Sequence, residues 1–245
     1  MKINEIRRTI LITGASRGLG AELVQVFAGE ADQVIGLYRQ SDSEVKILSE
    51  NAQMRGQHVQ FFKVNIGDSK EVKFFFAFLK EEGVVVDVLI NNAAITRDQN
   101  VILMKSEDWD EVMQVNLKGP IDCIQGVLPL MESNPSQERN FSKHIINIIS
   151  RVAMTGNRGQ SNYAVSKAAL LALTKVAALE LRSKNIQVNA VIPGLLPTRM
   201  TEGMDVMRNK SERSLRDVAE SIRAITELHA MTGEVFSLED RVFNY

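Results

Sequence analysis

Cysteine is nearly absent from this sequence, and its scarcity excludes several kinds of site. The 245 residues contain one cysteine, Cys123. A single thiol cannot form an internal disulfide or a metal site built from several cysteines. Cys123 lies in the apolar stretch 119–131, which favours a buried, inert thiol over a reactive nucleophile.

Charge imbalance and long apolar runs are also lacking. The 29 basic and 30 acidic side chains give a net charge of -1, so nothing favours a nucleic-acid partner. No apolar run reaches the length of a membrane span. Residues 1–8 are charged and lead into a short apolar strand, unlike a secretory signal peptide. We therefore expect a soluble cytoplasmic protein with no nucleic-acid or membrane partner.

What is present is a regular alternation of short apolar runs and longer helical patterns. Hydrophobic residues make up 44% of the chain and charged residues 24%, as in soluble domains. The runs predict strands at 8–13, 33–38, 59–64, 86–91, 144–149, 186–192 and 235–238. The intervening patterns predict helices at 18–30, 42–54, 69–82, 106–131 and 162–182. This alternation predicts one α/β domain over 1–245, a doubly wound, mostly parallel seven-stranded sheet with helices on both faces.

A glycine-rich turn follows the first predicted strand. Residues 13–20 read Thr-Gly-Ala-Ser-Arg-Gly-Leu-Gly and open the first predicted helix. Glycines let the backbone approach a pyrophosphate closely, and the helix amino terminus offers free N–H groups and a positive dipole end. A tight turn without a ligand is the alternative, but the strand–turn–helix context favours a dinucleotide site. The candidate cofactor-binding residues of this turn are Gly14, Ser16, Arg17, Gly18, Leu19 and Gly20.

The end of the second predicted strand indicates which dinucleotide binds. NAD enzymes usually place an acidic residue there, but this chain has Arg39. A guanidinium suits the 2′-phosphate of NADP(H), and Arg17 is placed to approach the same phosphate. Asp42 weakens the argument, and two solvated surface arginines are the alternative interpretation. We predict NADPH over NADH.

Ser150 and the pair Tyr163 and Lys167 form a candidate proton-delivering site. Tyrosine and lysine at positions i and i+4 share a helix face, and Ser150 follows the fifth predicted strand. A neighbouring ammonium is expected to lower the pKa of the phenol and make it an efficient proton donor to a carbonyl oxygen. The serine hydroxyl would donate to the same oxygen. The alternative is an amphipathic tyrosine with a snorkelling lysine, but the position at the carboxyl ends of the strands favours catalysis.

Further short motifs occur in order around these residues. They are Asn91-Asn92-Ala93-Ala94, Asn116 within Val-Asn-Leu, Pro193-Gly194 and Thr198. With the glycine turn and the Tyr163/Lys167 pair, the chain from about 8 to 201 resembles the short-chain dehydrogenase/reductase family. The stretches 92–98, 156–160 and 188–194 are most similar to its 3-oxoacyl-[acyl-carrier-protein] reductases.

This resemblance implies a role for each matching residue. Tyr163 would be the general acid, Lys167 would lower its pKa and hold the nicotinamide ribose, and Ser150 would orient the substrate oxygen. Asn116 would anchor a water of the proton relay. The remaining implied cofactor contacts are Asn65 and Ile66 at the adenine, Asn92 and Ala93 with Ala94 beside them at the ribose, and Pro193, Gly194 and Thr198 at the nicotinamide.

Three departures from the family pattern concern substrate selection and assembly. Ala94 replaces the usual glycine and adds a methyl group near the cofactor. The segment at about 199–216 is shorter than the family's substrate lid, which would leave the site open. The carboxyl terminus, 239–245, lacks the usual double-glycine turn.

The resemblance predicts NADPH-dependent reduction of a 3-oxoacyl thioester, carried on acyl carrier protein, in fatty acid biosynthesis. Arg151, Arg158 and Lys118 would draw an acidic carrier protein by charge, or are ordinary solvated side chains. Two alternatives stay open: a reductase of another carbonyl, such as a polyketide, sugar or small ketone, and a cofactor-binding regulator without turnover. The helices at 106–131 and 162–182 correspond to the family's subunit interfaces, which implies a homotetramer or a dimer.

Overall fold

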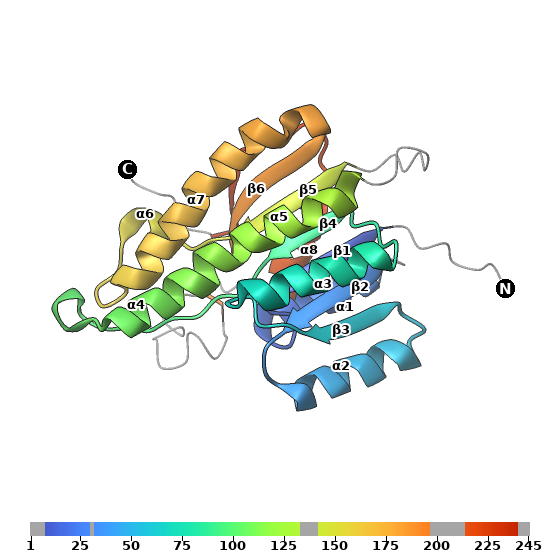
Figure 1. Cartoon of the computed structure of the whole chain (residues 1–245), viewed down its shortest axis with the longest axis horizontal. Coiled ribbons are helices and arrows are strands. Elements are labelled where there is room, and N and C mark those ends of the chain that lie inside the picture. The colour runs from blue at the N-terminus through green and yellow to red at the C-terminus, as the bar shows by residue number, and fades with distance from the viewer. Residues whose placement is uncertain (1–7, 30–31, 133–141, 197–213, 240–245) are drawn as a thin grey trace.

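The computed structural model describes residues 8–29, 32–132, 142–196 and 214–239, in which strands and helices alternate (Figure 1). The strands are β1 (Thr9–Thr13), β2 (Gln33–Tyr38), β3 (Val59–Lys63), β4 (Val88–Asn91), β5 (Lys143–Ile148), β6 (Ile186–Ile192) and β7 (Val235–Ser237). The α-helices are α1 (Gly18–Ala28), α2 (Asp42–Met54), α3 (Ser69–Glu81), α4 (Ser106–Met113), α5 (Gly119–Glu132), α6 (Val152–Thr155), α7 (Ser161–Leu181) and α8 (Leu215–Ile225). Shorter helical segments are η1 (Val101–Leu103), the π-helical η2 (Gln114–Lys118) and η3 (Arg182–Lys184).

All seven strands form a single sheet in the order β3-β2-β1-β4-β5-β6-β7. Every pair of neighbouring strands is parallel. The chain winds outward from β1 to β3, returns to the middle at β4, and then winds outward to β7. This reversal between β1 and β4 opens a crevice at the carboxyl ends of the strands, where doubly wound sheets bind ligands. The predicted α/β doubly wound fold is confirmed.

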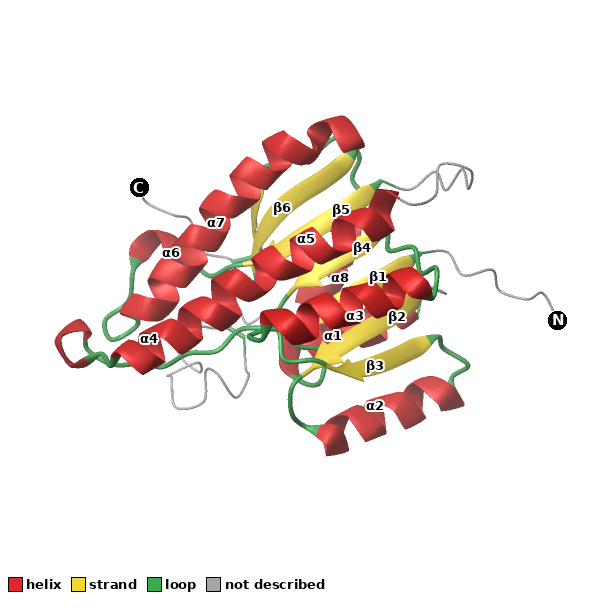
Figure 2. Ribbon diagram, viewed as in Figure 1, coloured by secondary structure: helices red, strands yellow, loops and turns green. Residues whose placement is uncertain are grey.

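Helices cover both faces of the sheet (Figure 2). Successive residues of a strand point to opposite faces. In β1, Leu11 packs into the layer made with α3, α5 and α7. Its neighbours Ile10 and Ile12 pack into the opposite layer, made with α1 and α8. Because both faces are buried, the strands are continuous apolar runs instead of alternating ones.

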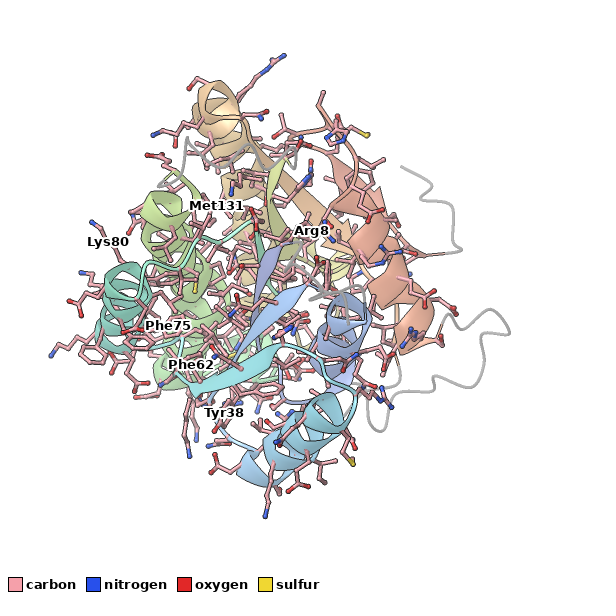
Figure 3. All side chains as sticks on the ribbon, turned by 90° about the vertical axis from the view of Figure 1, so that its right-hand side faces the viewer. Arg8, Tyr38, Phe62, Phe75, Lys80 and Met131 are labelled. Atoms are coloured by element: carbon pink, nitrogen blue, oxygen red, sulfur yellow. The ribbon has the colours of Figure 1, made fainter. Side chains whose placement is uncertain are left out.

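Aromatic side chains pack α3 against one face of the edge strand β3. Phe62 of β3 meets Phe75 of α3 with ring centroids 5.3 Å apart (Figure 3). Phe75 in turn meets Phe76 edge-on at 5.4 Å. Tilted and edge-to-face aromatic pairs stabilise by about 0.5–1.5 kcal/mol beyond their buried area. This cluster fixes α3 and, through it, the loop after β3 that borders the crevice.

Two predicted elements need correction. The helix predicted at 106–131 is divided into α4 and α5 by the π-helical turn η2. Helix α8 was not predicted, although Ser214 and Asp217 form a capping box at its start. The other element ends differ from the predicted ones by up to two residues, as is usual at helix and strand termini.

Cys123 lies in α5 with its side chain fully buried. Burial, and then the charge of Asp122, raise the pKa of this thiol to about 12. The thiol therefore stays protonated and unreactive at neutral pH, which confirms the prediction of an inert cysteine. Among the described residues, no helix combines the length and the apolar character that crossing a bilayer requires.

Candidate functional site

A cavity of about 910 Å³ lies at the carboxyl ends of the strands, around the crevice between β1 and β4. Residues predicted from separate parts of the sequence line this one cavity: Gly14, Ser16, Arg17, Gly18, Leu19, Gly20, Arg39, Asn65, Ile66, Asn92, Ala93, Ala94, Ser150, Tyr163, Lys167, Pro193 and Gly194. A cavity of this size is in the range of small-molecule and cofactor sites. Thr198 lies outside the described residues.

The glycine turn is shaped by close contacts that admit no side chain. Gly14 has φ of 67°, and a Cβ there would lie 2.8 Å from the Ala93 Cα. A Cβ on Gly20 would collide with the Gly14 carbonyl oxygen. Arg17 is the N-cap of α1 and makes no side-chain capping bond, and the first turn holds no acidic residue. The first-turn N–H groups and the positive end of the helix dipole therefore favour an anion in the cavity.

Hydrogen bonds from the end of β4 hold the glycine turn in place. The Thr13 hydroxyl accepts from the backbone N–H groups of Asn92 and Ala93, both at 3.0 Å. The Asn92 amide donates to the carbonyl oxygens of Thr13 at 3.0 Å and Gly14 at 3.2 Å. Asn92 is thus a structural bridge between β1 and β4 as well as a wall of the cavity. Thr13 was missed in the sequence, although it directly precedes the first glycine of the turn.

Arginines lie at the end of the cavity next to β2. Arg39 Nη1 lies 3.7 Å from Glu111 Oε1, and Arg97 Nη2 lies 2.8 Å from the other carboxylate oxygen, Oε2. Asp42, the acidic residue that counted against NADP(H), pairs with Lys63 at 2.9 Å. This hydrogen bond lowers the pKa of the Asp42 carboxyl. Asp42 does not line the cavity, and its carboxylate faces Lys63.

Ser150, Tyr163 and Lys167 meet at the opposite end of the cavity. Lys167 Nζ donates to the Ile148 carbonyl at 2.8 Å and lies 5.8 Å from the centroid of the Tyr163 ring. Burial lowers the pKa of Lys167 to about 8. Burial also raises the pKa of Tyr163 to about 12, against the opposing effect of its hydrogen bond with Ser150 and with a smaller contribution from Asp98. The tyrosine pKa thus moves opposite to the predicted direction, because loss of solvent disfavours the phenolate.

Asn116 lies behind the cavity instead of in its wall. Its amide oxygen accepts from the Ile95 N–H at 2.9 Å. Its amide nitrogen donates to the Ile95 carbonyl at 2.9 Å and to the Ser166 hydroxyl at 3.1 Å. The side chain therefore fixes the loop after β4 against α7, close to Lys167. That it anchors a water of a proton relay stays a prediction.

The remaining predicted segments frame the same cavity. Asn65 forms a local turn in which its side-chain oxygen accepts from the Gly67 N–H at 3.1 Å. Gly194 has φ of 85° and follows β6. Of the predicted short lid at 199–216, residues 199–213 lie outside the described residues, and the rest begins α8. Glu239 also lines the cavity and was not among the predicted site residues.

Comparisons with known proteins agree with this arrangement. The sequence profile of the short chain dehydrogenase family matches residues 8–209. The 3-oxoacyl-[acyl-carrier-protein] reductase FabG of Staphylococcus aureus is 38% identical over 200 residues, which cover 82% of this chain and 79% of that protein. The protein of the same name from Thermotoga maritima is 40% identical over 195 residues, covering 80% and 76%.

A solved structure shares the fold. The crystal structure of a short chain dehydrogenase from Burkholderia cenocepacia in complex with NADP aligns with a TM-score of 0.86 at 23% identity, covering 96% of this chain and 97% of that one. The resemblance inferred from the ordered motifs is confirmed by the profile match and by the two reductases. This chain belongs to the short-chain dehydrogenase family.

Proposed function

We propose that this protein reduces 3-oxoacyl thioesters, carried on acyl carrier protein, to 3-hydroxyacyl thioesters with NADPH. The observation that carries the proposal is that Ser150, Tyr163 and Lys167 line the same cavity as the glycine turn. A proton donor and a dinucleotide site that share one cavity suit a hydride-transfer reaction. The names of relatives that are 38% and 40% identical support the thioester substrate.

The residues that line the cavity suit each part of a dinucleotide. The open N–H groups at the start of α1 would hold the pyrophosphate. Arg39, with Arg17 nearby in the same wall, would bind the 2′-phosphate, and a guanidinium suits this group. The pairing of Asp42 with Lys63 offsets one acidic charge near the end of β2 that would oppose it. Lys167, Pro193 and Gly194 would lie at the nicotinamide end.

The residues around the carbonyl divide the chemistry between them. A bound NADPH supplies the hydride to the carbonyl carbon. Tyr163, with a pKa raised to about 12, is protonated at neutral pH and donates its proton to the carbonyl oxygen. Ser150 donates a hydrogen bond to the same oxygen. Lys167, still mostly cationic at pH 7, stabilises the phenolate left on Tyr163.

The carrier protein and the assembly belong to the same proposal. Arg158 is exposed on the loop before α7, and Lys118 pairs with Asp122. Arg158 is therefore better placed than Lys118 to steer an acidic carrier. Acyl carrier proteins are soluble, so the proposed activity is cytoplasmic.

We also propose a homo-oligomer assembled through α4, α5 and α7.

Turnover by a Tyr163→Phe variant tests the catalytic assignment. We expect the purified protein to oxidise NADPH in the presence of an acetoacetyl thioester. Loss of the phenol should lower kcat by about 10²- to 10⁴-fold, the usual contribution of a general acid, while NADPH still binds. Tyr38→Phe is the matched control for kcat, because it also removes one phenolic oxygen, but at the other end of the same cavity, beside Arg39. Unchanged turnover in Tyr163→Phe, or no reduction of the thioester by the unaltered protein, would contradict the proposal.

A further inference from the structure

An ion pair lies in the wall of the cavity next to Ser150. Arg151 follows Ser150 directly, and Glu239 lies just after β7. The Arg151 Nε and the Glu239 Oε2 are 3.8 Å apart, within ion-pair range but too far for a hydrogen bond. Their side chains are 40% and 11% exposed. The arginine therefore reaches open space in the cavity while the glutamate is mostly covered.

The backbone fixes where Glu239 lies. The Leu238 N–H donates to the Ile192 carbonyl at 2.9 Å, which continues the pairing of the chain after β7 with β6. This brings Glu239 against Gly194, where a Cβ would lie 3.3 Å from the Glu239 Cγ. Among the described residues, no hydrogen-bond partner reaches the buried Glu239 Oε2. The nearby guanidinium compensates its charge, and the carboxylate in turn attracts Arg151.

We propose that Arg151 is a specificity-determining residue that binds the thioester carbonyl oxygen while Ser150 and Tyr163 bind the 3-oxo oxygen. Glu239 acts as a positioning residue that holds the guanidinium. The inference rests on the proposed function, because a 3-oxoacyl thioester carries two carbonyl oxygens separated by a single methylene group. Consecutive residues, Ser150 and Arg151, supply donors from one stretch of backbone to these closely spaced acceptors.

A guanidinium suits this task better than the other side chains that donate hydrogen bonds. It carries five N–H donors in a rigid fork and stays charged at all physiological pH values. The Nε is the nitrogen nearest to Glu239, so within the described part of the chain the terminal nitrogens of Arg151 remain to donate to a substrate. A hydrogen bond from a charged donor to a carbonyl is stronger than one between neutral groups. An isolated ketone lacks the second acceptor and gains nothing from Arg151.

Two matched substrates test the inference in the whole protein with NADPH. One is an acetoacetyl thioester of N-acetylcysteamine, and the other is the thioether ketone in which a methylene replaces the thioester carbonyl. In Arg151→Met we expect kcat/KM for the thioester to fall about 10- to 100-fold, the range for a lost charge-assisted hydrogen bond. The value for the ketone should change less than about threefold. Glu239→Gln should shift the same ratio in the same direction, but less.

The controls separate selectivity from general damage. Arg55→Met removes an exposed arginine at the end of α2 and should leave both substrates unaffected. Arg151→Lys should keep part of the preference for the thioester, because a positive donor remains. Equal losses on both substrates, no loss on either, or weakened NADPH binding as the main defect would overturn the role of Arg151. If the unaltered protein does not reduce the thioester, the proposed function fails as well, and the two failures are thereby distinguished.

Discussion

At the scale of single residues, the environment of Lys167 sets the chemistry of the pair. Its ammonium is buried, and its Nζ donates to the Ile148 carbonyl at 2.8 Å. Burial lowers the pKa of Lys167 to about 8 and raises that of Tyr163 to about 12. At pH 7 the tyrosine is therefore protonated and the lysine mostly charged. A protonated donor beside a cation suits reduction, in which a proton leaves the phenol and negative charge develops on it.

The fall of kcat at alkaline pH should follow the deprotonation of Lys167. Below its folded-state pKa of about 8 the side chain is cationic, and above it the charge is lost. We expect kcat for carbonyl reduction to fall as pH rises through about 8, since the phenolate on Tyr163 loses its stabilising partner. The measurement is kcat between pH 6 and 10 at saturating NADPH.

A Lys167→Arg variant provides the control for this decline. Guanidinium keeps its charge over the whole range, so the decline near pH 8 should disappear even if the longer side chain lowers the absolute rate. A decline at the same pH in Lys167→Arg would assign it to another group. Titration of NADPH at both ends of the range shows whether the cofactor site stays intact.

Sequence spacing predicted this pair but not its electrostatics. Positions i and i+4 place Tyr163 and Lys167 on one helix face, and the ordered motifs place Ser150 beside them. The predicted fall in the tyrosine pKa was wrong for the structure described here, because burial outweighs the opposing hydrogen bond with Ser150. The burial of Tyr163 depends on β5 and the loop after β4, which pack over the helix. The spacing of residues within the helix gives no information about these distant segments.

At the scale of elements, helix α4 holds the arginines at the adenosine end of the cavity. Glu111 of α4 lies 3.7 Å from Arg39 and 2.8 Å from Arg97, and Asp108 lies 3.9 Å from Arg97. These side chains are more than a third exposed, so each pair contributes little to stability. Glu111 would nevertheless compete with a 2′-phosphate for the guanidinium of Arg39.

Glu111→Gln should therefore strengthen the binding of NADPH. Removing the carboxylate frees Arg39 and ends the repulsion of the 2′-phosphate, so we expect the Kd for NADPH to fall about two- to fivefold, as for an exposed ion pair. The Kd for NADH should not change, since NADH lacks that phosphate. Fluorescence titration at low and high salt measures both, and the gain should shrink at high salt.

Asp108→Asn is the matched control for the effect of Glu111. It removes one acidic charge from the same helix, but from a residue that faces Arg97. An equal gain in Asp108→Asn would mean that the overall charge of α4, and not the contact with Arg39, governs the affinity. A gain for NADH as large as that for NADPH would exclude the 2′-phosphate as the cause.

The secondary-structure elements differ in how clearly their sequences predict them. The apolar runs of β1, β2 and β6 predicted those strands within a residue. The π-helical turn η2 could not be predicted, because the bonds of Asn116 to Ile95 and Ser166 come from distant segments. Helix α8 had a signal: the Ser214 capping box precedes Val218, Ala219, Ile222 and Ile225, which are all buried. The rest of the surface of α8 is polar, which made the helical spacing of these apolar residues hard to recognise in the sequence.

At the scale of the whole molecule, the sheet order follows from right-handed crossovers. The assembly of subunits depends instead on exposed surfaces, which the hydrophobic pattern of the sequence does not define. Helix α7 carries an apolar stripe of Val165, Ala172, Val176 and Leu179, which are all exposed. Their spacing of 7, 4 and 3 residues places them on one helix face. A hollow of about 320 Å³ along α4, η2 and α5 is lined by the apolar side chains of Met113, Leu117 and Ile121 together with the polar ones of Asp110, Gln114 and Lys118. An exposed apolar stripe such as that of α7 is typical of subunit interfaces.

Leu179→Lys should therefore weaken the proposed assembly. A two-fold interface contains each residue twice, so a single substitution removes two apolar contacts and introduces two charges. Burying a leucine contributes about 1.5–3 kcal/mol, so losing two of them should raise the dissociation constant at least about 10²-fold. Sedimentation velocity over a concentration series measures this change.

Phe74→Lys on α3 is the matched control, since Phe74 is 79% exposed and Leu179 is 77% exposed. If both variants sediment like the unaltered protein, or if the unaltered protein is a monomer at every concentration, α7 does not form the interface. If Phe74→Lys alone dissociates, the interface lies at α3 instead.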